Sequence, residues 1–399
     1  MPGMDMDHGG HAMRGALGSY PSTREASGTA WQPDTSEHEG LMTQSGDWML
    51  MAHGNLTAVG SVQGGLRGDD KLFVEGMVMG MARRDFANGD ALQFRAMISP
   101  DPLMGKAGYP ILLASGETAD GVHPLLDRQH PHDFFMELSA SYSKQLGDKS
   151  SAFIYAALPG EPAFGPPAFM HRQAISTSPE APITHHWLDS THISFGVLTG
   201  GVVLDRVKIE ASRFNAREPD QHRWNIETGP LDSTSVRLSW NPAPEWSLQG
   251  SWAYFKDPEQ LEPGVDQRRL SASAAYTRPL ARGWWATSLA WGRKTAEGES
   301  DDAFALEGSV KRDAWTLFGR AEIAENRELL DDHVTDEHGP AFRVGKLSLG
   351  VARDLALSGP FKVTAGMTGT VNFVPSGLAG SYGGKHPLGG MAFVRVGLR

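Results

Sequence analysis

The chain has 399 residues, enough for two or three soluble domains or for one large barrel. It carries 36 Lys and Arg against 47 Asp and Glu, a formal net charge of -11. This balance argues against nucleic acid as a partner, because neutralising phosphate requires clustered cations. The absence of cysteine excludes disulfides, thiolate metal sites and cysteine nucleophiles.

Residues 1–46 are rich in Gly, Met, His, Ser and Pro and show little periodicity, so we expect a flexible periplasmic arm. Its first residues, MPGMDMDHGG, lack the basic and apolar regions of a signal peptide, and we expect a processed, mature end. The stretch MDMDHGGHAM combines thioethers with imidazoles, a set that suits copper in both oxidation states. The alternative is a solvated tail without a role. The candidate ligands are Met4, Met6, His8, His11 and Met13.

Residues 47–399 repeat one unit, in which a run of ~9–13 residues alternates apolar with small or polar side chains before a turn. Short connections such as GDKS and NPAPE alternate with long ones. The long connections are residues 100–133, 159–190, 216–232, 258–267, 326–340 and 376–387.

An outer-membrane barrel is built in this way, with the termini on the short-turn side and long extracellular loops. The sequence therefore predicts an all-β fold, a transmembrane antiparallel outer-membrane β-barrel of about 16 strands, rather than a soluble β-sandwich. The expected location is the outer membrane of a Gram-negative bacterium, in contact with lipid and lipopolysaccharide. A homo-oligomer is one option, by analogy with trimeric porins.

The stretch FVEGMVMGMARR, residues 73–84, places methionine at every second position. If Leu72, Val74 and Val78 face lipid, the period of two turns the intervening side chains toward the lumen. The preceding run predicts the same inward orientation for a second set. Together, the inward candidates for a soft-metal strip are Met49, Met51, His53, Met77, Met79 and Met81. The alternative is that these methionines are flexible fillers packed against an inward loop.

Two long loops carry histidines beside acidic residues, in the blocks PLLDRQHPHDFF and PPAFMHRQAISTSPEAPITHHWLDSTH. In an extended segment, His-x-His directs both imidazoles to one side, as metal ligation requires. A structural alternative is a hydrogen-bonding network that anchors the loops to the wall. The candidate metal ligands are His130, His132, Asp133, His171, His185, His186 and His192.

Two resemblances accompany these motifs. The Met- and His-rich arm resembles the N-terminal region of the copper resistance protein B family, outer-membrane barrels with a similar tail; this resemblance covers only the tail and the barrel class. The DRQHPHD and HHWLDSTH blocks resemble those of an uncharacterised proteobacterial outer-membrane family. That family implies a shared site and no established activity.

The leading hypothesis is a barrel that handles copper or a similar transition metal in binding, resistance or transport, with the metal ion as partner and copper as cofactor. The first alternative is a substrate-selective porin for a small solute, with lumen cations Arg83, Arg95, Arg206, Lys208 and Arg395. The second is an outer-membrane hydrolase using residues of DSTH, but adjacent residues of one strand cannot form a triad and no G-x-S-x-G occurs. We therefore expect a protein that is not an enzyme.

Overall fold

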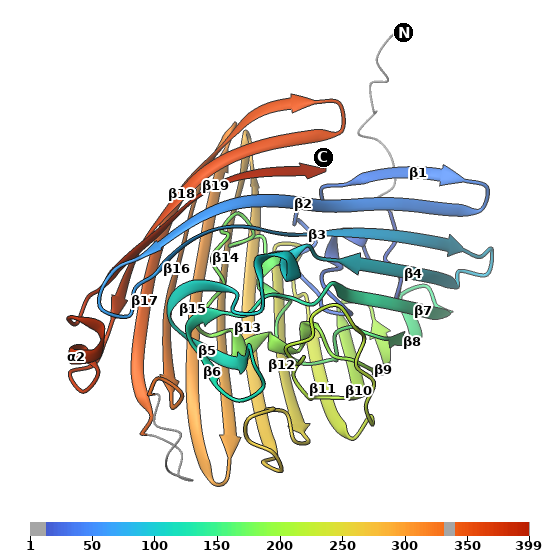
Figure 1. Ribbon diagram of the computed structural model, residues 1–399. Helices are drawn as coiled ribbons and strands as arrows, with labels where there is room; N and C mark the ends of the chain where they lie inside the picture. The colour runs from blue at the N-terminus through green and yellow to red at the C-terminus, as the bar shows by residue number, and fades with distance from the viewer. Residues whose placement is uncertain (1–12, 331–339, 399) are drawn as a thin grey trace.

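The computed structural model describes residues 13–330 and 340–398, and its main feature is a closed antiparallel barrel of 16 strands (Figure 1). The ring runs from β2 to β4, continues with β7 and ends with β19. It closes where β19 pairs with β2, from Gly389 opposite Gln63 to Gly397 opposite Asn55. The predicted fold class and strand number are confirmed.

The barrel strands differ in length, and most are between 8 and 17 residues long. They are β2 Trp48–Gln63, β3 Asp70–Asp85, β4 Ala91–Ile98, β7 Phe135–Gly147, β8 Ser150–Ala157, β9 Val197–Leu204, β10 Val207–Phe214, β11 Ser233–Trp240, β12 Trp246–Phe255, β13 Gln267–Leu280, β14 Gly283–Ala296, β15 Glu299–Arg312, β16 Trp315–Asn326, β17 Phe342–Ser358, β18 Phe361–Phe373 and β19 Leu388–Leu398. A further strand, β1 (Leu41–Ser45), forms a hairpin with the start of β2.

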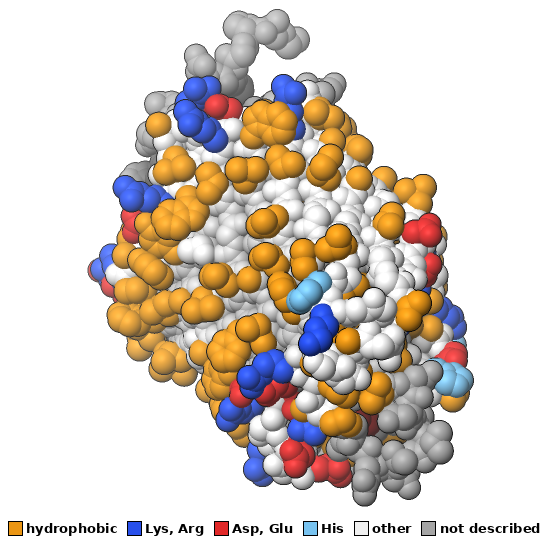
Figure 2. Space-filling model, turned by 90° about the vertical axis from the view of Figure 1, so that its left-hand side faces the viewer, with side chains coloured by type: hydrophobic (Ala, Val, Ile, Leu, Met, Phe, Trp, Pro, Cys, Tyr) orange, Lys and Arg blue, Asp and Glu red, His pale blue; other side chains and the backbone are white. Residues whose placement is uncertain are grey.

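The outer face is apolar, as a lipid-facing barrel surface must be. Alternate side chains of the strands are exposed, and Leu72, Leu289 and Leu349 are more than half exposed, while their neighbours point inward. Figure 2 shows this face, with hydrophobic side chains over the middle and most charged side chains toward the two ends. In the described part of the chain, no helix has the length and apolar character needed to cross a bilayer.

Two long connections fold back into the barrel from the long-loop end (Figure 1). The first forms a two-stranded sheet, β5 (Tyr109–Thr118) with β6 (Pro124–Gln129), and is preceded by the 3-10 helix η2 (Asp101–Met104). Its residues Ile111, Leu112 and Leu113 are at most 1% exposed. The connection β16–β17 includes residues outside the described ranges, and β18–β19 carries the short helix α2 (Ala379–Tyr382).

The second inward connection, residues 158–196 between β8 and β9, crosses the lumen, and we call it the crossing loop. It carries η3 (Phe169–His171), α1 (His185–Leu188) and η4 (Ser190–His192). The loop bonds to strands on the opposite side of the barrel, which shows that it spans the interior. Its wall partners include Arg237, Glu307, Glu322, Lys346 and Arg395.

Of the segment 1–46 that we expected to be a flexible arm, the structure describes residues 13–46, and these are folded against the barrel. Residues 13–40, which we call the N-terminal plug, lie inside the short-turn end, and they include the short 3-10 helix η1 (Ser22–Arg24). The plug follows the inner circumference, contacting Gly89, Ser143, Ser151, Asp205, Asn241, Thr277, Trp284 and Lys362 in turn. Aperiodic, polar composition suggested disorder, but the polar inner wall supplies hydrogen-bond partners that such a segment needs.

Candidate functional site

Five of the predicted histidines meet in the lumen, and we call His130, His132, His185, His186 and His192 the histidine centre. The first two follow β6, and the other three come from α1 and η4 of the crossing loop. The ring centroids of His130, His185 and His186 are 5.4–5.8 Å apart. The centroid of the His192 ring lies 5.3 Å from that of His185 and 5.1 Å from that of His132. The two separate sequence blocks therefore form one cluster.

Each imidazole of the centre is held through Nδ1. In three rings Nδ1 donates to a carboxylate: His132 to Asp101 at 2.8 Å, His185 to Asp189 at 2.8 Å and His186 to Glu218 at 3.1 Å. The Nδ1 of His192 bonds to the Asp189 backbone carbonyl at 2.7 Å. The Nδ1 of His130 bonds to the Pro131 backbone carbonyl at 3.4 Å and lies 3.2 Å from the Glu117 carboxylate. Because a carboxylate or carbonyl accepts at Nδ1, the proton sits there and Nε2 keeps its lone pair.

The Nε2 atoms of all five rings are buried and have no hydrogen-bond partner. Burial lowers the pKa of His130 and His192 well below the usual value and lowers that of His185 and His186 as well, although Asp189 opposes the shift at His185. These four rings are therefore neutral at physiological pH. Neutral imidazole with a fixed Nδ1 proton is the form that ligates a transition metal.

The imidazole nitrogens lie close together but do not surround a common point. In residues 13–330 and 340–398, no three histidine, aspartate or glutamate side chains are already arranged to hold a metal ion. Ligation would require the rings to turn toward a common point. Because their Nε2 atoms make no hydrogen bonds, such rotation breaks no bond at the ligating atom.

A buried ion network supports the crossing loop beside the centre. The Arg172 guanidinium pairs with Asp189 and, through Nε, with Glu307 at 2.7 Å. Burial opposes ionisation of Asp189, but Arg172 and His185 outweigh it and hold the pKa of that carboxyl below its usual range. The Asp189 side chain is therefore an anion that fixes the His185 ring.

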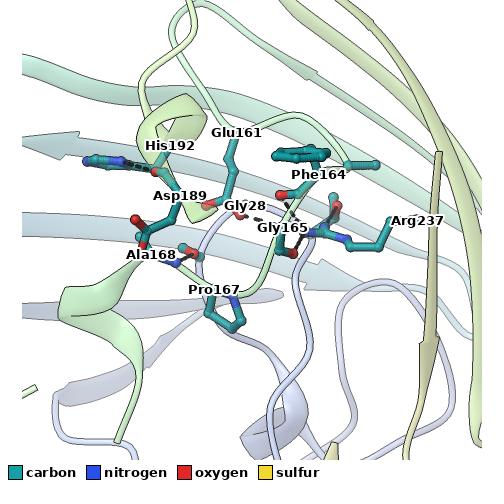
Figure 3. A network of polar contacts seen from close by, with 12 residues as sticks. Gly28, Glu161, Phe164, Gly165, Pro167, Ala168, Asp189, His192 and Arg237 are labelled. Carbon is teal, nitrogen blue, oxygen red and sulfur yellow. Dashed lines mark hydrogen bonds and ion pairs between the residues drawn. The ribbon is translucent and has the colours of Figure 1, made fainter. Parts of the chain in front are cut away.

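A second carboxylate nearby is only weakly paired. Glu161 of the crossing loop lies between the Asp189–His192 turn and Arg237 (Figure 3). Its carboxylate is 3.8 Å from the Arg237 guanidinium, and neither oxygen has a partner at hydrogen-bonding distance. Burial raises the pKa of Glu161 to about 7, although Arg237 acts in the opposite direction. Arg237 donates instead to the carbonyls of Phe164 and Gly165.

The structure confirms the predicted inward orientation of the methionines. Val74 and Val78 are more than 40% exposed, whereas Met77 is 4% exposed. Strand pairing places Met81 opposite Met51 and Met79 opposite Met97. The prediction that side-chain alternation takes these residues off the lipid face therefore holds.

Several predicted ligands lie elsewhere. Met4, Met6, His8 and His11 fall outside the described residues, and Met13 is at the start of the N-terminal plug, where its carbonyl accepts from Ser22. Half-buried Met49, Met51 and Met81 line the inner wall, and the Nδ1 of His53 binds the Glu39 carbonyl at 2.7 Å. Asp133 pairs with Arg223 at 3.2 Å. His171 makes no ring contact with the described residues of the histidine centre but lines the same small cavity as His192.

The sequence reasoning missed two acidic partners of the centre, Asp101 and Glu117, and the buried Met136. Asp101 and Glu117 lie in the same long loop as His130 and His132. A local pattern carries no signal for them, because their approach to the rings depends on how the loops pack together. The only indication in the sequence was that these acidic residues, like the histidines, lie in the long loops.

The residues proposed for a hydrolase have other partners. Ser190 Oγ accepts from Arg269 at 3.3 Å, and His192 Nδ1 donates to the backbone of Asp189. Because His192 Nε2 has no hydrogen-bond partner among the described residues, it is not bonded to the Ser190 hydroxyl as a serine–histidine pair would require.

The cations expected to line an open lumen are engaged as well. Arg83 donates to the plug carbonyls of Arg14 and Gly15, Arg95 pairs with Glu137 at 2.9 Å, and Lys208 pairs with Glu210 at 3.0 Å. Arg395 donates to the carbonyl of Ser176 in the crossing loop at 2.8 Å. The prediction for Arg206 is wrong, because this residue lies exposed in the short turn between β9 and β10. The N-terminal plug and the crossing loop thus accept hydrogen bonds from Arg83, Arg95, Lys208 and Arg395.

No protein family model matches the chain, and no curated protein matches it. Solved outer-membrane porins share the fold. The Salmonella typhi OmpF in complex with daunomycin has a TM-score of 0.54 and 9% identity over 90% of this chain and 99% of its own. The Pseudomonas putida OprB gives 0.53 with 9% identity, covering 88% and 94%, and the anion-selective porin from Comamonas acidovorans gives 0.51 with 11%, covering 88% and 100%. At these identities the likeness concerns the fold, which fits the outer membrane of a Gram-negative bacterium.

Proposed function

We propose that this protein is a plugged, porin-like outer-membrane barrel that binds a transition-metal cation at the histidine centre, with copper as the first candidate. The observation that carries the proposal is the state of the five imidazoles. Each is held at Nδ1 by an oxygen acceptor and has a buried, unpartnered Nε2. Burying so many imine nitrogens without a partner costs free energy, and a ligated metal would offset that cost.

The composition of the site favours a borderline cation. Imidazole suits copper, zinc and nickel, whereas an oxygen-rich site would suit magnesium or calcium. In this centre the carboxylates are engaged with Nδ1 atoms, which leaves nitrogen as the available donor. The arrangement is typical of carboxylate–histidine–metal sites, in which the acid orients the ring.

The proposal is tested by titrating the purified, metal-free full chain with Cu(II) and with Co(II), whose visible absorption reports nitrogen ligation. We expect saturable binding that His185→Ala weakens by about tenfold or more, since ligand loss removes a direct bond. His222→Ala is the matched control, because His222 is exposed and lies outside the centre. Dissociation constants no tighter than about 1 mM, or equal affinity in both variants, would contradict the proposal.

A second candidate is a gated channel for a small solute, which the porin fold favours. In this structure the lumen cations are bonded to the N-terminal plug and crossing loop, so a solute path would require one of these segments to move. Conductance of the full chain in planar bilayers separates the two functions. A large, steady conductance that copper leaves unchanged would favour the channel, and a closed barrel would favour the binding protein.

A further inference from the structure

A group of methionines forms a second buried feature of the lumen. We call Met77, Met79, Met97, Met136 and Met170 the methionine cluster; they pack with Ile193, Phe195 and Ile226. Methionine accounts for 16 of 399 residues, yet it supplies five of the eight apolar side chains here. An ordinary core would use more Leu, Ile and Val, whose shapes pack more specifically than flexible methionine.

The strand register contributes to this concentration of thioethers. Met97 is opposite Glu137, but Ile98 is opposite Phe135, so a register shift leaves Met136 without a direct partner in β4. At this irregularity, the consecutive residues Met136 and Glu137 are both buried. A bulge that turns an extra side chain inward is typical of positions with a local role.

A small cavity adjoins the cluster. Its volume is about 10 Å³, close to the space for one water-sized atom, and its lining includes Met97, His171 and His192. The Nε2 atoms of His171 and His192 are buried without a hydrogen-bond partner. Burial also lowers the pKa of His171 to about 3, so its imidazole is neutral. Met97, His171 and His192 thus line one atom-sized space, together with the acidic residues Glu137 and Glu161.

From this juxtaposition we propose a second metal site, in which Met97 Sδ and His171 Nε2 bind a soft monovalent cation of the Cu(I) class. Soft thioethers select Cu(I), and in a chain without cysteine they are the only soft donors. Neighbouring thioethers of the methionine cluster complete the coordination. This inference extends the proposed function, because it names the oxidation state that a separate part of the lumen would hold.

The site is tested with Ag(I), a redox-inert probe for Cu(I), on the metal-free full chain. We expect Met97→Leu/Met136→Leu to bind about one Ag(I) fewer than the wild type while its Co(II) absorption is unchanged. Methionine-to-leucine exchange conserves side-chain volume and is well tolerated in packed interiors, so the variant should fold. The control is Met367→Leu, since Met367 is 61% exposed on the outer face.

The variant keeps the Met- and His-rich N-terminus, so silver bound by that segment cancels in the comparison. Equal Ag(I) binding by wild type and variant, or an equal loss in the control, would overturn the methionine site. If the wild type does not bind Co(II), the proposed metal binding at the histidine centre is refuted, while the Ag(I) result still tests the methionine site separately. As a second variant, His171→Ala should also lose the Ag(I) equivalent, and full retention there would refute its role as ligand.

Discussion

Removing the Trp31 side chain should release the N-terminal plug. Trp31 is 4% exposed and packs edge-on against Tyr20 at 5.0 Å. It lies between two cations, with the Arg24 guanidinium 4.8 Å and the Lys208 ammonium 5.0 Å from its ring. Truncation of a buried Trp to Ala costs about 3–5 kcal/mol, which includes the lost packing and cation–π contacts. The plug's open population should therefore rise by about two to three and a half orders of magnitude.

Tryptic cleavage at Arg24 measures this opening, because the Arg24 side chain is buried and paired with Asp34 at 2.6 Å in the closed state. When opening is fast relative to cleavage, the cleavage rate follows the open population. We expect Trp31→Ala to be cleaved far faster than wild type, and Trp224→Ala, at an exposed loop position, to behave as wild type. A cleavage rate for Trp31→Ala within about threefold of wild type would refute this account of the plug.

Three further predictions concern the crossing loop and the histidine centre. Burial raises the pKa of Glu161 from its ordinary 4.5 to about 7, so the folded state binds the proton more tightly and the stability should fall as the pH rises between these values. Glu161→Gln should therefore raise Tm more at pH 8 than at pH 5. An equal gain in Tm at both pH values would contradict this prediction. Arg172→Met should lower the free energy of unfolding, measured by urea titration, by about 3–5 kcal/mol, because it leaves buried carboxylates without their cation. The double variant Arg172→Met/Glu307→Gln should recover part of this free energy, and no recovery would argue against the pairing of Arg172 with Glu307. Gly116→Ala should weaken Co(II) binding by about tenfold, because the added Cβ would lie 2.6 Å from the His186 ring and the backbone φ at this position is +113°. An unchanged Co(II) affinity would exclude His186 as a ligand.

The barrel itself was predictable because its signal is local. In β3, exposed Leu72 and Val74 alternate with inward side chains, and the lipid–lumen difference imposes this alternation on every strand. The same rule gave the inward direction of Met77 and its neighbours. Turn lengths also follow from the chain order, since short turns and long loops alternate along most of the ring.

The N-terminal plug could not be predicted, because a segment without periodicity shows no sign of the partners that bury it. Thr29 illustrates the point. Its hydroxyl donates to Glu210 at 2.6 Å, a residue 181 positions away that the sequence gives no reason to pair with it. Polar composition alone favours disorder, and only a polar wall that meets those groups can reverse this outcome.

The sequence by itself determined the antiparallel barrel and the number of its strands, and it supplied the histidines that meet in the lumen, because period-two patterning and composition are properties of the chain alone. Only the tertiary structure decided which of those residues meet. His130 and His185 are 55 positions apart, and their contact depends on how the segment after β6 and the crossing loop lie together inside the closed ring. Where loops fold within a lumen, proximity is set by the wall that confines them, and no local pattern records that confinement.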